Sequence, residues 1–172
     1  MGEAMMMRRA GGGAKGVAGV LISRDMTSNT APAGTVSASG YYTGQTSYSP
    51  WHAFSTKTGP DAWSHTKNNW VQYAPWAEYV EIEFTKMWLH NSTQYPKEYF
   101  ATFKLQGVSD DGTVSDITGT LSATQEQWNA GFEVPCSFKG KAIRFLGLTT
   151  GGTDRGTLSA CRIYGTVTVL PA

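Results

Sequence analysis

Short runs that alternate between apolar and polar residues, separated by glycine-rich turns, recur along most of this chain and constrain its fold more than any other feature. The segment 79–84 alternates with a period of two, which places Val80, Ile82 and Phe84 on one face and two glutamates on the other. Short strands with intervening loops and no long helix predict an all-β fold, a jelly-roll β-sandwich. Further strands are expected at 99–105, 142–148 and 161–169.

Three local patterns refine this expectation. The segment 142–148 carries apolar residues on both faces, which indicates a central strand. The segment 109–112 reads Ser-Asp-Asp-Gly and predicts a turn in which Gly112 takes a positive φ. The helix signal is one short turn at 124–128, where Thr124 and Gln127 have the spacing of a capping box.

The first 20 residues differ from the rest of the 172-residue chain. They are rich in methionine and glycine and show no apolar period, so we expect residues 1–20 to form an N-terminal arm. Residues 21–172 are then one domain, since a core of this size folds without disulfides or metals. The arm is either flexible or becomes ordered by docking into a larger assembly, and the sequence leaves both interpretations open.

Composition excludes several classes of partner. Charged residues make up 16% of the chain and the formal net charge is +1, so there is no basic stripe of the kind that binds nucleic acid. No run approaches the roughly 18 apolar residues that a membrane helix needs, so we expect no membrane insertion. We also expect no secretory signal peptide, because the apolar part of the first 22 residues is short and is interrupted by Gly16 and Gly19.

Catalytic and metal-binding patterns are missing from the sequence, which predicts a protein that is not an enzyme and holds no cofactor. The three histidines are isolated from one another and from cysteine at ligand spacing, and no nucleophile elbow or phosphate loop is present. Glu81 and Glu83 are explained by the solvated face of a strand. Cys136 and Cys161 are expected to be reduced, buried thiols.

Aromatic residues are the informative population, with 6 Trp, 8 Tyr and 7 Phe in a weakly charged domain. Trp63 and Trp70 are expected in the core. Other rings lie in segments that look like loops, beside amides, His or Arg, and this combination suits a sugar: a ring packs on the C–H face of a pyranose while polar groups bind its hydroxyls. The expected ligand-facing set is Tyr41, Tyr42 and Trp51 for stacking, and His52, His90, Asn91 and Arg155 for hydrogen bonds to hydroxyls or to an acidic sugar.

The order of several short motifs resembles that of a discoidin domain, also called the coagulation factor 5/8 type C or galactose-binding-like family. The resemblance extends from about residue 25 to 167. It implies a jelly-roll sandwich whose loops at one end bind a glycan. The matching segments are 26–30, 36–39, Trp51–Phe54, Trp63-Ser64, Trp70–Tyr73, Phe103–Gly112, Ala142–Leu148 and Arg162–Gly165.

The chain departs from this family at the positions that help to build a structural calcium site in some members. Where many members read Phe-Asp-Gly, this chain has Phe54-Ser55-Thr56, and where many have a glutamate it has Ala160. Because Ca²⁺ requires several oxygen ligands, the resemblance does not extend to a calcium site, even with Asp61 as a partial substitute.

Domains of this family without a signal peptide also resemble modules of bacteriophage tail and virion proteins. We therefore expect a phage protein of the tail or virion surface, assembled in the host cytoplasm and exposed outside the cell. It would bind a host-surface glycan, contact other virion proteins through the arm, and form a homo-oligomer whose repetition raises avidity. Two alternatives stay open: a structural adaptor or decoration protein in a virion, and a carbohydrate-binding module accessory to a separate glycosidase.

Overall fold

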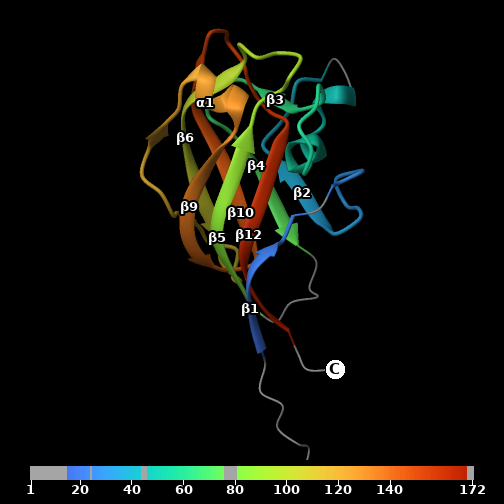
Figure 1. Cartoon of the computed structure of the whole chain (residues 1–172), viewed down its shortest axis with the longest axis vertical. Helices are drawn as coiled ribbons and strands as arrows, with labels where there is room; N and C mark the ends of the chain where they lie inside the picture. The colour runs from blue at the N-terminus through green and yellow to red at the C-terminus, as the bar shows by residue number, and fades with distance from the viewer. Residues whose placement is uncertain (1–14, 24, 44–45, 76–80, 170–172) are drawn as a thin grey trace, which may run out of the picture.

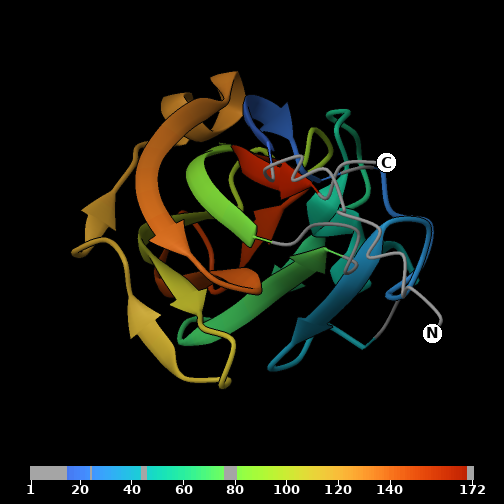
Figure 2. The same cartoon turned by 90° about the horizontal axis from the view of Figure 1, so that it is seen from below.

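The structure is a computed structural model that describes residues 15–23, 25–43, 46–75 and 81–169 (Figure 1). It contains two antiparallel sheets that face each other across one core, as the view from below shows (Figure 2). This architecture confirms the expected all-β sandwich. The smaller sheet has the order β1 (Lys15–Leu21), β12 (Ala160–Val169), β5 (Glu81–His90) and β9 (Phe132–Lys139).

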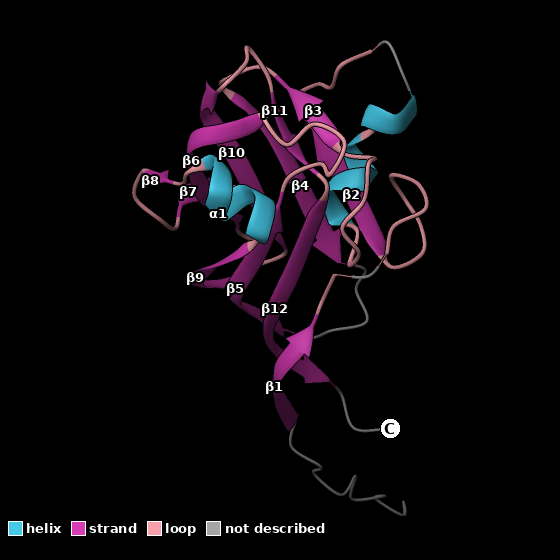
Figure 3. Cartoon of the chain, turned by 45° about the horizontal axis from the view of Figure 1, so that its top comes forward, coloured by secondary structure: helices cyan, strands magenta, loops and turns pink. Residues whose placement is uncertain are grey.

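The larger sheet contains the predicted central strand. β10 (Ala142–Gly151) lies between β4 and β6, with five register pairs to β4 and nine to β6. A separate ladder of two short strands, β3 and β11, lies toward the upper end of the sandwich (Figure 3). The remaining strands are β2 (Gly34–Ala38), β3 (Trp63–His65), β4 (Asn69–Pro75), β6 (Tyr99–Val108), β7 (Val114–Asp116), β8 (Leu121–Ser122) and β11 (Gly156–Leu158).

Three short helices complete the described elements, namely η1 (Thr46–Tyr48), η2 (Pro50–Phe54) and α1 (Gln125–Ala130). The capping box expected at Thr124 is present: its side chain accepts from the Gln127 amide, and the Gln127 side chain accepts from the Thr124 amide. Gly112 has a φ of 90°, which confirms the turn before β7. Over the described residues, no helix is long and apolar enough to cross a membrane.

Aromatic rings cluster around two tryptophans of the core. Trp63 and Trp128 are fully buried, and rings from β6 and β10 pack between them at centroid separations of 5.2 to 6.5 Å. Each indole also donates a hydrogen bond of 2.8 Å to a backbone carbonyl, that of Gly40 from Trp63 and that of Phe100 from Trp128. A buried indole needs such a partner, so these bonds fix the rings in position.

The expectation for Trp70 was wrong. Val71 and Tyr73 of β4 point into the core, so the alternation of the strand places Trp70 on the outer face. There the Arg144 guanidinium lies 3.8 Å from the centre of the indole ring and also donates to Gln72. Seven-residue spacing from Trp63 was therefore no guide to burial, because the two tryptophans lie on different strands.

The boundary of the expected arm also needs correction. Residues 15–20 belong to β1, which pairs antiparallel with β12 from Lys15↔Val169 to Leu21↔Tyr164. β1 lacks an alternating pattern because it is an edge strand and its formation depends on hydrogen bonds to β12 rather than on a buried face. Residues 1–14 lie outside the described part, so the two interpretations of the arm stay predictions for that segment.

Candidate functional site

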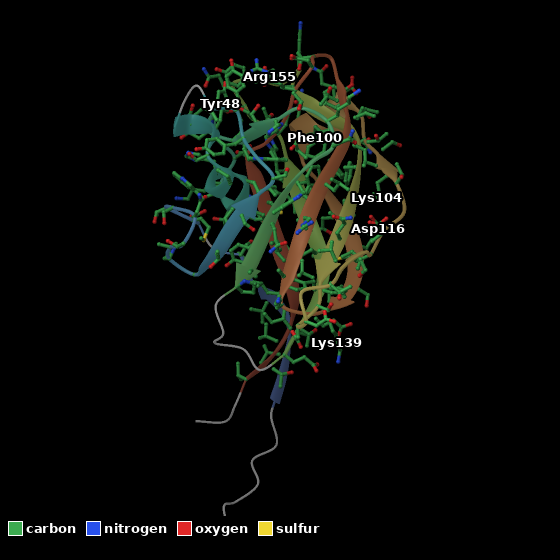
Figure 4. All side chains as sticks on the ribbon, turned by 180° about the vertical axis from the view of Figure 1, so that it is seen from behind. Tyr48, Phe100, Lys104, Asp116, Lys139 and Arg155 are labelled. Atoms are coloured by element: carbon green, nitrogen blue, oxygen red, sulfur yellow. The ribbon has the colours of Figure 1, made fainter. Side chains whose placement is uncertain are left out.

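The upper end of the sandwich, opposite the start of β1 and the end of β12, carries a group of aromatic and ionisable side chains that we call the upper site; its two tyrosines are exposed, and its ionisable residues are partly or largely buried. It consists of Tyr41, Tyr42, His65, Glu98 and Arg155. Figure 4 shows Arg155 and, close to it, Tyr48 at this end, far from Lys139 at the other.

Tyr42 is the more exposed of the two tyrosines that form the aromatic surface of the upper site. Its side chain is 48% exposed, and Tyr41 beside it is 42% exposed. The backbone amide of Tyr42 donates to the Ser64 carbonyl of β3 at 3.0 Å, and the Trp63 indole holds the preceding Gly40 carbonyl. The loop that presents the tyrosines is therefore fastened to the core by two hydrogen bonds.

Arg155 supplies the cation of the upper site. Its guanidinium lies 4.6 Å from the centre of the Tyr42 ring, within the range of a cation–π contact. Nη2 donates to Oε1 of Glu98 at 3.1 Å. Thr153 braces the loop, because its hydroxyl accepts from the Arg155 amide and donates to the Arg155 carbonyl. The fold thus places Tyr42 and Arg155 side by side.

Glu98 lies under Arg155 and is only 6% exposed. Burial raises the pKa of its carboxyl group, while the neighbouring Arg155 charge lowers it. Oε2 is buried and has no hydrogen-bond partner among the described residues. A buried carboxylate is costly unless it is paired, and the partly buried Arg155 guanidinium is the partner of this one, so Glu98 and Arg155 hold each other in position.

Two further tyrosines support this pair from below. Tyr48 is buried, with its ring 5.7 Å from that of Tyr42 and 5.9 Å from that of Tyr95. Burial raises the pKa of Tyr48 to about 12, and a hydrogen bond with Tyr95 adds to the effect. The Tyr48 phenol therefore stays neutral near pH 7 and can take part only as a hydrogen-bond donor or acceptor.

His65 lies at the end of β3, in register with Gly156, which follows Arg155. Its Nδ1 accepts from the Thr66 amide at 2.7 Å, so the proton of the neutral ring is on Nε2. Burial lowers the pKa of this imidazole, which favours the neutral form. A Cβ at Gly40 would lie 2.7 Å from Nε2, so the loop requires glycine there.

Four of the expected site residues do not belong to this group. Trp51 and His52 of η2 stack on each other at 3.5 Å and line a separate pocket of about 230 Å³. That pocket shares no lining residue with the upper site and is completed by Met26, Ser55, Lys57, Thr58, Gly59, Pro60, Asp61 and Ser159.

His90 and Asn91 are buried, with exposures of 6% and 1%, rather than turned toward solvent. The Asn91 amide donates to Pro96 and to Asn129, and His90 Nδ1 contacts the Asn91 carbonyl. These bonds hold the β5–β6 loop against α1. Both residues therefore position that loop, and they line a further pocket of about 240 Å³ that shares no residue with the upper site.

Sequence reasoning missed His65 and Glu98. His65 follows Trp63-Ser64 directly, and Glu98 stands between Tyr95 and Tyr99, so an ionisable residue within an aromatic segment was the available signal. Neither position could be connected with Arg155, because the three residues come from segments that are distant in sequence.

The segments that correspond by resemblance to the structural calcium site of some discoidin domains do lie together. Their side chains, however, do not suit a metal ion. The Thr56 carbonyl accepts from Arg162 Nε at 2.9 Å, and Asp25 accepts from the Thr56 amide and hydroxyl at 2.6 Å each. A guanidinium thus lies at an oxygen that a cation would use. Among the described residues, no three His, Cys, Asp or Glu side chains gather as metal ligands.

No protein-family model and no curated protein matches this chain. Solved structures do match its fold. The module CpGH89CBM32-5 from Clostridium perfringens, in complex with GalNAc-β-1,3-galactose, has a TM-score of 0.65 at 10% identity and covers 77% of this chain and 99% of its own. The CBM32 of AlyQ, in complex with 4,5-unsaturated mannuronic acid, has a TM-score of 0.60 at 12% identity, with 75% and 92% covered.

Wild-type discoidin II from Dictyostelium discoideum matches with a TM-score of 0.60 at 14% identity, covering 81% of this chain and 55% of that one. The expected resemblance to discoidin domains is therefore confirmed at the level of the fold. This chain has the galactose-binding-like β-sandwich that carbohydrate-binding modules of family 32 and discoidins share. At such identities the likeness extends to the fold alone.

Proposed function

We propose that this chain is a non-enzymatic carbohydrate-binding protein that binds a glycan at the upper site. The observation that carries the proposal is the exposed ring of Tyr42 beside the Arg155 guanidinium, which the buried Glu98 holds in position. A sugar would stack its C–H face on the exposed tyrosines and accept hydrogen bonds from Arg155 and from His65 Nε2. The related modules named above were solved with sugars bound, which supports this assignment.

A shallow site of this kind predicts weak binding of single chains. Two exposed rings and a few hydrogen bonds bury little surface, so measurable attachment depends on several copies acting together. The ligands of the two related modules are an uncharged and an acidic sugar, so the fold does not decide the charge of the ligand.

The test is a glycan-array and whole-cell binding screen of the full chain displayed on beads. We expect saturable binding that free sugar competes away. Tyr42→Ala should lower the affinity at least tenfold, which corresponds to about 1.4 kcal/mol of binding free energy. Val114→Ala is the matched control, because Val114 is 39% exposed but lies on β7. Equal binding by both variants would contradict the assignment to the upper site.

We further propose, from the sequence resemblance, that the chain is displayed on a phage tail or virion surface. In that setting the N-terminal segment would contact other virion proteins, several copies would act together, and the module would attach the particle to host glycan. Mass spectrometry of purified particles should then find the chain. Its absence from particles, with glycan binding intact, would favour a module that serves a separate glycosidase.

A further inference from the structure

We infer that Glu98 is the specificity-determining residue of the upper site: by occupying the Arg155 guanidinium, it makes the site prefer uncharged glycans to carboxylated ones. This inference rests on the proposed function and names the class of ligand that the same site selects. An arginine in a sugar site commonly suggests an acidic ligand, because a guanidinium binds carboxylates in two-point geometry. Here the carboxylate of Glu98 already occupies part of the hydrogen-bonding capacity of the Arg155 guanidinium.

The carboxylate of Glu98 is built into the wall of the site. Its backbone amide donates to the Tyr95 carbonyl at 2.9 Å, and its own carbonyl accepts from the Thr157 amide at 3.0 Å and hydroxyl at 2.8 Å. The side chain is nine-tenths buried, so it has no solvated position to which an incoming ligand could displace it. A ligand carboxylate must therefore share Arg155 with Glu98.

The neighbouring charged side chains of Asp154, Lys67 and Lys97 are more exposed to solvent than Glu98. Asp154 lies 3.8 Å from Arg155 Nε but is 88% exposed, so solvent screens it more strongly than Glu98. Lys67, which follows His65 by two residues, and Lys97, which precedes Glu98, are exposed. These lysines favour anions in general, but they supply no fixed two-point partner, whereas the buried carboxylate repels an acidic sugar at the contact itself.

Protonation of Glu98 should change the preference of the upper site in the same way as removal of its charge by mutation. Burial raises the pKa of its carboxyl group, so the group becomes neutral at a higher pH than an exposed glutamate. Lowering the pH then releases Arg155 and improves binding of carboxylated sugars relative to uncharged ones. His65 acts in the same direction when it becomes protonated, although burial lowers the pKa at which this occurs.

The experiment measures the affinities of the full chain for a galactose oligosaccharide and for the galacturonic acid oligosaccharide of the same linkage and length. We expect the wild type to prefer the uncharged sugar. Glu98→Gln should shift the ratio of the two affinities toward the acidic sugar by about tenfold, the equivalent of one removed charge contact. Asp154→Asn removes a neighbouring charge that is exposed, and should shift the ratio by much less.

A pH series of the wild type does not depend on the folding of the variant. For the wild type, the same ratio should move toward the acidic sugar as the pH is lowered, because burial raises the pKa of Glu98 above that of an exposed glutamate, and Glu98→Gln should flatten that change. An unchanged ratio in Glu98→Gln, or a wild type that prefers the acidic sugar at pH 7, would overturn the inference while leaving glycan binding intact. Failure of the wild type to bind any sugar in the bead screen counts against the proposed function itself.

Discussion

At the scale of single residues, Trp63 connects the hydrophobic core with the upper site. Its ring stacks on Phe100 at 5.7 Å, while its indole N–H holds the Gly40 carbonyl just before the exposed tyrosines. Trp128 is equally buried and makes the same kind of bond, but to the Phe100 carbonyl of β6 rather than to the loop that carries the tyrosines. The two tryptophans are therefore a natural matched pair.

We predict that Trp63→Phe lowers glycan affinity and that Trp128→Phe does not. Each change removes one buried hydrogen bond and part of a ring, so each should lower the free energy of unfolding by about 2 kcal/mol. Urea unfolding measures the stability, and the bead assay measures binding. Equal affinities for the two variants would show that the Gly40 contact does not position the tyrosines.

At the scale of elements, the features that depend on local sequence were predicted best. The central strand β10 and the turn at 109–112 are confirmed, because the distribution of apolar residues along a strand and the residue types of a turn are local properties. Within β6, strict alternation over 99–105 would place Tyr99 and Ala101 on the same face as Phe103 and Leu105, but Phe100 is buried in their place. The register between β6 and β10 shifts near Thr149, and such an irregularity changes which residues face the core.

β1 gives the prediction at this scale. Deleting residues 1–14 should leave the free energy of unfolding unchanged, because β1 begins at Lys15. Deleting residues 1–20 removes nearly all of β1, exposes the backbone groups of β12, and should lower stability and promote self-association. Urea unfolding and size-exclusion chromatography distinguish the two chains. Identical behaviour would contradict the pairing of β1 with β12.

At the scale of the whole molecule, the fold brings together side chains that the sequence could not connect. The upper site takes residues from the loop after β2, from β3, from the end of the β5–β6 loop and from the loop before β11, and no local pattern links these segments. Aromatic richness indicated a sugar site and included Tyr42, but only the packing of the sheets determined which rings are exposed and which fill the core.

The cysteines report on the integrity of this packing. Both are free, as expected; Cys161 is fully buried and Cys136 half-buried. Burial raises the pKa of Cys136 to about 11 and that of Cys161 well above its usual value, so neither forms a thiolate readily. We predict slow labelling by a thiol reagent at pH 8 and fast labelling of both in urea. Rapid labelling of Cys161 in the native protein would contradict the compact core.

The most direct test of glycan binding at the upper site is nuclear magnetic resonance of the isotopically labelled full chain, titrated with a glycan that binds in the screen. Binding at the upper site predicts saturable shifts that are largest at the amides of Tyr41, Tyr42, His65 and Arg155. Shifts concentrated instead around the pocket of Trp51 and His52, or spread without saturation, would contradict the placement of glycan binding at the upper site.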